Sequence, residues 1–313
     1  MAADPGPPRL DWARDGQGWP HREASRFVRA GGLRWHLQAF GPPPDRAPTV
    51  LLLHGTGAAT HSWRGLAPLL ADSCHVLAPD LPGHGFTGMP PPHQLSLPGM
   101  AAALATLLRA LGASPLLVVG HSAGAALGAR LLLDDGCAAS GLVGLNGAWL
   151  PFGGLPGRLF SPAARLLAGL GDATPARLFA RLAAHDPVLD RLLASTGSSI
   201  DPLGRRCYAQ LAGNPGHVAG TLSMMARWDL RALIRDLPRL EAALLLVVGA
   251  ADTTVPPGQS ERVARLVARA TVRRLDRLGH LAHEENPQAV ADAILELARR
   301  TVAPASGDRS PPA

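Results

Sequence analysis

The stretch LLVVGHSAGAALGARLLL, residues 116–133, joins an apolar run to a helix-like run through a polar seam. The seam, Gly120 to Gly124, fits the pattern Gly-x-Ser-x-Gly with Ser122 at its centre. In this pattern a nucleophilic serine occupies a strained turn between a strand and a helix, where small neighbours let the backbone pass closely. The N-terminus of the following helix also favours developing negative charge. The context therefore predicts a nucleophile elbow rather than a glycine-rich turn with a chance serine.

Short apolar runs alternate with helix-like segments on both sides of this stretch. Continuous apolar runs are typical of strands buried on both faces of a parallel sheet. Residues 26–41 read as an antiparallel hairpin that turns at Gly31-Gly32. The strand-like runs, most of them almost continuously apolar, are 49–55, 74–80, 115–121, 140–147, 242–252 and 270–280. The helix-like segments are 62–71, 96–112, 123–135, 257–269 and 287–300. The alternation predicts a doubly wound, mostly parallel α/β sheet with an N-terminal hairpin.

One long segment interrupts this alternation. Residues 150–229 contain no strand signal, only leucine- and arginine-rich helical pieces, so we expect an inserted helical lid. The α/β core then comprises residues 25–149 and 230–302. An N-terminal extension, residues 1–24, is polar and rich in glycine and proline, and residues 303–313 have the composition of a disordered tail.

The charge pattern excludes several classes of protein. All 30 basic residues are arginine, and they are spread along the chain among acids, so no nucleic-acid-binding or membrane-binding patch is expected. Without lysine there is no P-loop lysine, no Schiff base and no Ser-Lys dyad. Residues 83–88 satisfy Gly-x-Gly-x-x-Gly, but MPPPHQ follows and cannot open a helix, which excludes a dinucleotide site. No cofactor is predicted.

Three cysteines, an odd number without Cys-x-x-Cys spacing, indicate neither a disulfide framework nor a zinc site. The first residues, MAADPGPPRLDWARDG, contain charges and no apolar segment, so they are not a signal peptide. The most apolar run contains His121 and Arg130, which argues against a transmembrane span. We therefore expect a cytoplasmic protein without a metal site.

A serine nucleophile needs a general base, and the base needs a group that orients it. In the elbow fold these follow along the chain in the order serine, acid, histidine. Asp252 ends one strand-like run and His280 follows the next, so both belong to the carboxyl edge of the sheet. Asn146 also ends such a run, but a carboxamide cannot stabilise an imidazolium as a carboxylate does. The predicted triad is therefore Ser122, His280 and Asp252.

The transition state also requires donors for an oxyanion. The segment HGTGAATHSW, residues 54–63, follows a strand at the place where such a loop arises. We assign the oxyanion hole to the main-chain amides of Thr56 and Ala123, and we expect His54 to support this loop rather than act as an acid. His283 is expected to be a solvated or helix-capping histidine, because no third ligand for a metal lies nearby.

These features together resemble the α/β-hydrolase superfamily over residues 25–300. Several segments look more closely like the magnesium-chelatase accessory protein family of bacteriochlorophyll biosynthesis. The discriminating ones are WPHREAS near the N-terminus and, in or beside the lid, LNGAWLPFGG and NPGHVAGTLSMMARWDLRAL. The resemblance implies a role near magnesium insertion into protoporphyrin and magnesium-chelatase subunits as partners. It supplies no reaction, and a chain without ATPase machinery cannot be the motor of a chelatase.

The first functional hypothesis is hydrolysis of an ester of a bulky apolar molecule, such as a porphyrin ester, because the lid is rich in Leu, Ala and Phe. Side chains that line such a pocket, or that simply attach the lid to the core, are His121, Phe152, Leu155, Phe160, Phe179, Met224, Met225 and Trp228. A second hypothesis is a non-catalytic tetrapyrrole carrier, in which His185 and His217 approach the metal, although surface positions are expected for both. A third keeps the triad for a cofactor-free perhydrolase or carbon–carbon bond hydrolase.

Overall fold

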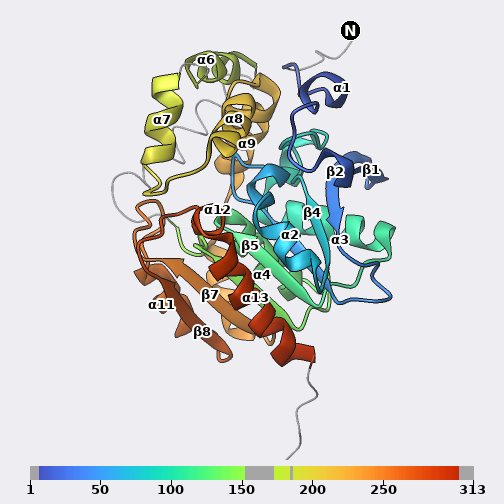
Figure 1. Cartoon of the computed structure of the whole chain (residues 1–313), viewed down its shortest axis with the longest axis vertical. Coiled ribbons are helices and arrows are strands. Elements are labelled where there is room, and N and C mark those ends of the chain that lie inside the picture. Colours follow the sequence, from blue (N-terminus) through green and yellow to red (C-terminus); the bar gives the residue numbers. More distant parts are fainter. Residues whose placement is uncertain (1–6, 152–172, 184–185, 303–313) are drawn as a thin grey trace, which may run out of the picture.

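The computed structural model describes residues 7–151, 173–183 and 186–302. An eight-stranded sheet forms the centre, in the order β1-β2-β4-β3-β5-β6-β7-β8 (Figure 1). β1 and β2 form an antiparallel hairpin, β2 is antiparallel to β4, and the six strands from β3 to β8 are parallel. The strands are β1 (Ser25–Ala30), β2 (Leu33–Phe40), β3 (Thr49–Leu53), β4 (His75–Pro79), β5 (Leu117–His121), β6 (Gly141–Leu145), β7 (Ala243–Gly249) and β8 (Ala270–Leu275). The predicted sheet and its N-terminal hairpin are confirmed.

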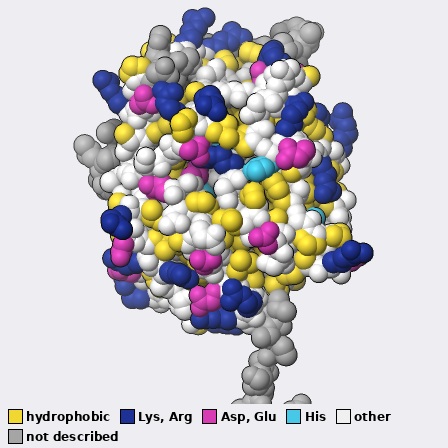
Figure 2. Space-filling model, in the orientation of Figure 1, with side chains coloured by type: hydrophobic (Ala, Val, Ile, Leu, Met, Phe, Trp, Pro, Cys, Tyr) yellow, Lys and Arg dark blue, Asp and Glu magenta, His cyan; other side chains and the backbone are white. Residues whose placement is uncertain are grey.

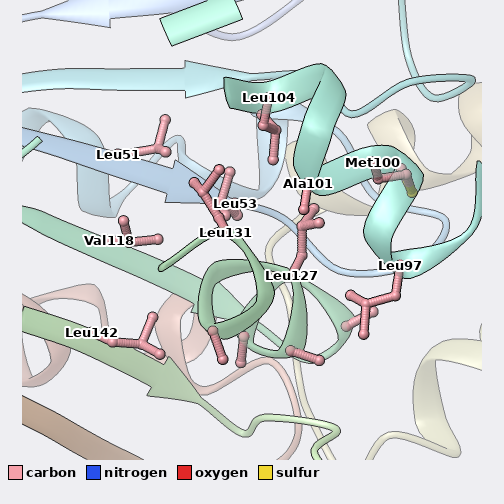
Figure 3. Packing of buried hydrophobic residues seen from close by; sticks show 14 of the residues in the cluster. Leu51, Leu53, Leu97, Met100, Ala101, Leu104, Val118, Leu127, Leu131 and Leu142 are labelled. Carbon is pink, nitrogen blue, oxygen red and sulfur yellow. The ribbon is translucent and has the colours of Figure 1, made fainter. Parts of the chain in front are cut away.

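Successive residues of the central strands enter two separate cores, because side chains alternate between the faces of a sheet. On one face, Leu51, Val118 and Leu142 pack against α3 and α4 (Figure 3). On the other face, Leu52 and Val119 belong to a second core with α2 and α13. The helices are α2 (Leu66–Ala71), α3 (Leu97–Leu111), α4 (Ala123–Leu133), α11 (Gly258–Ala264) and α13 (Pro287–Val302). Coverage of both faces explains why the strands are apolar throughout.

The helix predicted over residues 62–71 is shorter in the structure. Residues Thr60–Trp63 form a 3₁₀ turn, η2, and α2 begins only at Leu66, after Gly65. Pro68 then falls in the first turn of α2, where an amide has no intrahelical acceptor and a missing N–H costs nothing. Two further 3₁₀ turns, η3 (Pro92–Leu95) and η4 (Leu237–Arg239), precede α3 and β7.

Between β6 and β7 the described residues form helices and no strand. α6 packs against α9, and α8 packs against both α7 and α9. Figure 1 shows this group at one end of the sheet beside α12 (Ala282–Glu285). Asp201 and Asn214 cap α8 and α9, each followed by a proline at the first helical position, which is a strong start signal. The helices are α6 (Ala173–Ala183), α7 (Asp186–Ala194), α8 (Pro202–Ala212), α9 (Pro215–Arg227) and α10 (Arg231–Asp236).

Residues 7–24, whose composition gave no sign of a fold, form an arm packed against the core. It contains α1 (Trp12–Asp15) and a 3₁₀ turn, η1 (Arg22–Ala24). Trp19 is 3% exposed and donates its indole N–H to Thr60 Oγ1 at 2.9 Å. The Arg9 guanidinium donates to four carbonyl oxygens, those of Gly83, Gly85, Thr87 and Gly216. The arm therefore ties the loop after β4 to α9.

The surface agrees with the dispersed charge of the sequence. On the face shown in Figure 2, arginine and acidic side chains are interspersed rather than gathered into one stripe. No helix among the described residues has the length and apolarity needed to cross a membrane.

Candidate active site

Ser122 occupies the turn between β5 and α4 in a strained conformation. Its φ of 52° and ψ of −118° lie where residues with a side chain rarely occur, at a typical cost of about 1–3 kcal/mol. Both glycines of the pattern are required by close packing. A Cβ on Gly120 would lie 2.2 Å from the carbonyl oxygen of Gly124, and one on Gly124 would lie 2.1 Å from that of Leu53. The close packing of this turn therefore explains both glycines of the sequence pattern.

His280 and Asp252 form a buried pair at the carboxyl edge of the sheet. The two atoms joined are His280 Nδ1 and Asp252 Oδ2, 2.8 Å apart, and the Asp252 side chain is fully buried. Asp252 Oδ1 accepts the main-chain N–H groups of Thr254 and Val255, both at 2.8 Å. These bonds hold the carboxylate in place and fix the proton of the ring on Nδ1. Nε2 is therefore the nitrogen that is able to accept a proton.

Asn146, the alternative acid from the sequence, has a different position. Its Nδ2 donates to Asp252 Oδ2 at 2.8 Å, so it binds the carboxylate instead of replacing it. Asn146 has a φ of 46°, a left-handed conformation that asparagine tolerates better than most residues. An Asn directly after a buried strand was the available signal for this role.

The segment between β8 and α13, residues 276–286, carries His280 and is called the histidine loop below. His121 joins the elbow to this loop. Its Nε2–H donates to the carbonyl oxygen of His280 at 2.9 Å, and its ring contacts the rings of His280 and His283. His121 is 3% exposed, so it lies behind the elbow. Burial, together with its histidine neighbours, holds the pKa of His121 well below its ordinary value. Among the described residues, the Ser122 hydroxyl forms no hydrogen bond with the His280 ring. Such bonds often tighten only when substrate binds.

The loop after β3 lies directly beside Ser122. A Cβ on Gly55 would lie 3.1 Å from Ser122 Cβ, so the loop approaches the serine as closely as glycine permits. His54 is fully buried, donates Nδ1–H to the Gly55 carbonyl oxygen and accepts the Leu81 N–H. It supports the loop, as expected from the sequence.

The two amides assigned to an oxyanion hole belong to this loop and to α4. Thr56 is exposed at the tip of the loop, and Ala123 is buried as the first residue of α4. The first N–H groups of a helix have no acceptor within the helix. The Ala123 N–H is therefore available to an anion, and the partial positive charge of the helix terminus adds to it.

Two histidines differ from expectation. His283 is 1% exposed rather than solvated and donates Nε2–H to Ser62 Oγ at 2.9 Å. His217 is 2% exposed rather than at the surface; its Nδ1 accepts the Gly85 N–H and its Nε2–H donates to the Gly57 carbonyl oxygen. Burial lowers the pKa of each to about 3, so both are neutral. Ring packing across distant segments buries them, and one sequence does not reveal such packing.

No group of three His, Cys, Asp or Glu side chains in the described part of the chain is able to hold a metal.

Only some of the predicted pocket residues belong to the described part of the chain. Met224 is 1% exposed and belongs to the main core, while Met225 and Trp228 are half-buried. Phe152, Leu155, Phe160, His185 and the side chain of Phe179 lie outside the described residues.

A surface groove of about 490 Å³ is lined by residues that include Leu97, Arg130, Leu133 and Asp236. Arg130, one of the charged residues of this groove, donates to Asp236 at 2.8 Å. Leu133 ends α4, whereas Ser122 precedes its first residue. The groove therefore lies at the wrong end of α4 to serve the candidate site.

A buried charged network adjoins the histidine loop and was not predicted. Glu284 is fully buried within α12 (Ala282–Glu285) and pairs with Arg64 after η2. Glu284 Oε1 also accepts the hydroxyls of Ser62 at 2.6 Å and Tyr208 at 2.7 Å. Arg64 in turn donates to Asp201, the cap of α8, at 2.7 Å. The network therefore joins the loop after β3, the histidine loop and the inserted helices.

The fold is that of the α/β-hydrolase family. The chain belongs to the alpha/beta hydrolase fold family, whose family model matches residues 48–287. It is 39% identical over 278 residues to the Magnesium-chelatase 30 kDa subunit of Rhodobacter capsulatus, covering 89% of this chain and 95% of that protein. The resemblance inferred from the sequence is thereby confirmed.

Other relatives are hydrolases. The pimeloyl-[acyl-carrier protein] methyl ester esterase of Methylococcus capsulatus is 31% identical over 265 residues, which cover 80% of this chain and 95% of that protein. The crystal structure of an alpha/beta hydrolase fold protein from Burkholderia ambifaria has a TM-score of 0.72 at 24% identity, covering 93% of this chain and 99% of that chain. This structural likeness establishes the fold alone.

Proposed function

We propose that the chain is a serine hydrolase with Ser122 as nucleophile, His280 as general base and Asp252 as the group that orients it. The observation that carries the proposal is the buried His280–Asp252 bond at the edge of the sheet where the strained Ser122 turn stands. Strain of this kind persists only where surrounding structure maintains it, and it is common at reactive residues. The free Nε2 of His280 supplies the proton acceptor that a serine needs near neutral pH.

The reaction has two similar halves. Ser122 Oγ bonds to the acyl carbon while His280 Nε2 takes the hydroxyl proton, and the Thr56 and Ala123 amides bind the resulting oxyanion. The intermediate collapses, the alcohol leaves with the proton from His280, and the acyl group stays on Ser122. Water then attacks the acyl carbon in the same way and releases the acid. Loss of one oxyanion donor typically costs about 2.7–4 kcal/mol of transition-state stabilisation.

The proposed substrate is an ester of a bulky apolar molecule. We propose residues 150–229 as a lid over the core formed by residues 25–149 and 230–302. This segment is rich in leucine and alanine and contains three of the six phenylalanines of the chain. We propose a role beside magnesium chelatase in (bacterio)chlorophyll biosynthesis, with a porphyrin ester as substrate and chelatase subunits as partners. The similarity to a protein named as a magnesium-chelatase subunit supports this role.

A fluorophosphonate probe tests the serine directly. The wild-type protein should gain one adduct, located by mass spectrometry on the peptide that contains Ser122. Ser122→Ala should gain none, and Ser73→Ala, which changes an exposed serine, should label as the wild type does. A folded wild-type protein that stays unlabelled at Ser122 would contradict the hydrolase proposal.

A second candidate is a non-catalytic tetrapyrrole carrier. One observation favours it: the 39% identical relative is named as a magnesium-chelatase subunit. Titration of wild type and Ser122→Ala with protoporphyrin and magnesium protoporphyrin separates the candidates. Equal binding by both proteins, together with full biological complementation by Ser122→Ala, would favour the carrier.

A further inference from the structure

The connector between α7 and α8, residues 195–201, contacts the loop that carries His280. The main-chain N–H of His280 donates to the Thr196 carbonyl oxygen at 3.0 Å, and that of Leu281 donates to Ser198 Oγ at 2.8 Å. The Ser199 N–H donates to a carboxylate oxygen of Glu285 at 3.0 Å. Thr196, Ser198 and Ser199 of the connector thus form hydrogen bonds with the histidine loop. These bonds come from the insertion and not from the sheet.

The same connector also contacts the loop that carries Asp252. Thr253 Oγ1, one residue beyond the acid, donates to the Ser195 carbonyl oxygen at 2.8 Å. Gly197 has a φ of 73°, and a Cβ there would lie 2.3 Å from the Ala251 carbonyl oxygen. On the other side, a Cβ on Gly279 would lie 2.4 Å from the Gly197 carbonyl oxygen. The connector backbone therefore packs between the loop that carries Asp252 and the histidine loop.

The end of the connector is anchored in the buried network. Asp201 accepts two hydrogen bonds from Arg64, at 2.7 and 3.0 Å, and its other oxygen caps α8 by accepting the Gly204 N–H. Arg64 pairs with Glu284, which stands four residues after His280. The end of the connector at Asp201 and the part of the histidine loop at Glu284 are thus joined through the buried Arg64.

We propose that this connector is a positioning element that sets the His280 ring relative to Asp252 and Ser122, with Ser198 as its decisive side chain. The proposal rests on the serine hydrolase function proposed above. A general base must stand within hydrogen-bond reach of the proton it removes, and small displacements of catalytic groups are costly. Ser198 touches neither substrate nor reacting atoms. It acts through the Leu281 N–H, which adjoins the base.

The kinetic test compares three variants of the full-length protein. Ser198→Ala removes the acceptor of the Leu281 N–H, so kcat for an activated ester should fall about tenfold while KM changes less than about twofold. The rate of fluorophosphonate labelling should fall by the same factor. Ser198→Thr keeps a hydroxyl and should restore most of kcat. Ser199→Ala, which keeps the main-chain N–H to Glu285 and changes only an exposed neighbour, should behave as the wild type.

Amide hydrogen exchange measured by NMR provides a readout that does not depend on turnover. In Ser198→Ala the amides of His280 and Leu281 should exchange faster, while those of the central strand β5 should keep wild-type rates. Unchanged exchange at both amides and unchanged kcat would overturn the proposal. A general acceleration that includes β5 would also overturn it, because it would mean ordinary destabilisation. Absence of labelling at Ser122 in the wild type would overturn the hydrolase function alone, since exchange would still decide whether the connector holds the histidine loop.

Discussion

Asn146 Nδ2 lies 2.8 Å from Asp252 Oδ2, the same oxygen that accepts the His280 ring proton. The end of β6 therefore contributes to the acid–histidine pair, although neither member of the pair is on β6. The carboxylate receives donors from three sides, and its orientation depends on all of them.

Replacement of Asn146 by aspartate should reduce kcat about tenfold to hundredfold. The near-isosteric change removes a donor and sets a second carboxylate beside Asp252, which destabilises the charged form that orients His280. The left-handed backbone is retained, because aspartate also tolerates it. Steady-state ester hydrolysis at pH 7 to 8 checks the prediction. An unchanged kcat in a folded variant would show that Asn146 has no influence on the pair.

Replacement of Glu284 by glutamine should destabilise the protein by about 3 kcal/mol, because the buried Arg64 would lose its only fully buried carboxylate partner among the described residues and keep the half-exposed Asp201. The other partner of Arg64 supplies the matched comparison. Asp201 is 52% exposed, so Asp201→Asn should cost about 1 kcal/mol or less. Urea unfolding of both variants measures the difference. Equal losses would mean that burial does not control the strength of this network.

The fold was predictable, and a triad could be proposed, because both leave recognisable patterns in the sequence. Gly120 is required by its contact with Gly124 in the turn, and Gly124 by the close approach of Leu53 on β3. Asp252 follows the apolar strand β7, and His280 follows β8. The histidine environments were not predictable. His283 and His217 are neutral because burial lowers the pKa of each ring. The segments that bury them include Ser62 and Gly57, which are 221 and 160 positions away, and nothing in the adjacent sequence reports those contacts.

The arm and the charged network were missed for a similar reason. Arg9 bonds to carbonyl oxygens 74 to 207 positions away, and Arg64 pairs with a carboxylate 220 positions away. In a chain with 30 arginines, no local feature marks the ones that become buried. The three-dimensional contacts therefore decide which charges are structural.

Acid should destabilise the protein progressively below pH 6.5. Burial lowers the pKa of His217 and His283 to about 3 in the folded state, from an ordinary value of 6.5. Between these values the unfolded chain binds protons that the folded chain does not, so stability is lost as the pH falls, by about 1.4 kcal/mol per pH unit for each histidine. Urea unfolding over this range should therefore show a shallower pH slope for His217→Gln. If the free energies of unfolding of the variant and the wild type fall equally with pH, the conclusion that His217 is neutral in the folded protein is contradicted.

Replacement of Arg9 by methionine should destabilise the protein by about 1–3 kcal/mol. The methionine keeps much of the apolar stem but leaves part-buried carbonyl oxygens without their donor. Arg14 in the same arm is 72% exposed, and Arg14→Met should leave the unfolding midpoint unchanged. Thermal unfolding of the pair checks whether the arm is held through Arg9, and equal midpoints would contradict that role.

Ser122→Gly should be more stable than Ser122→Ala by about 0.5–2 kcal/mol, although both should be inactive. The turn holds this residue at a φ of 52°, which glycine adopts without the steric cost that a Cβ imposes. Alanine keeps the Cβ and hence the strain, and both variants lack the hydroxyl. The difference between their free energies of unfolding therefore reports the backbone strain and not the loss of the hydroxyl. Glycine also gains more entropy on unfolding, which opposes the effect by about 0.5–1 kcal/mol. Denaturant unfolding of both variants measures the balance. If the alanine variant is the more stable one, the turn stores no strain, and the conformation of Ser122 loses its value as evidence for a nucleophile.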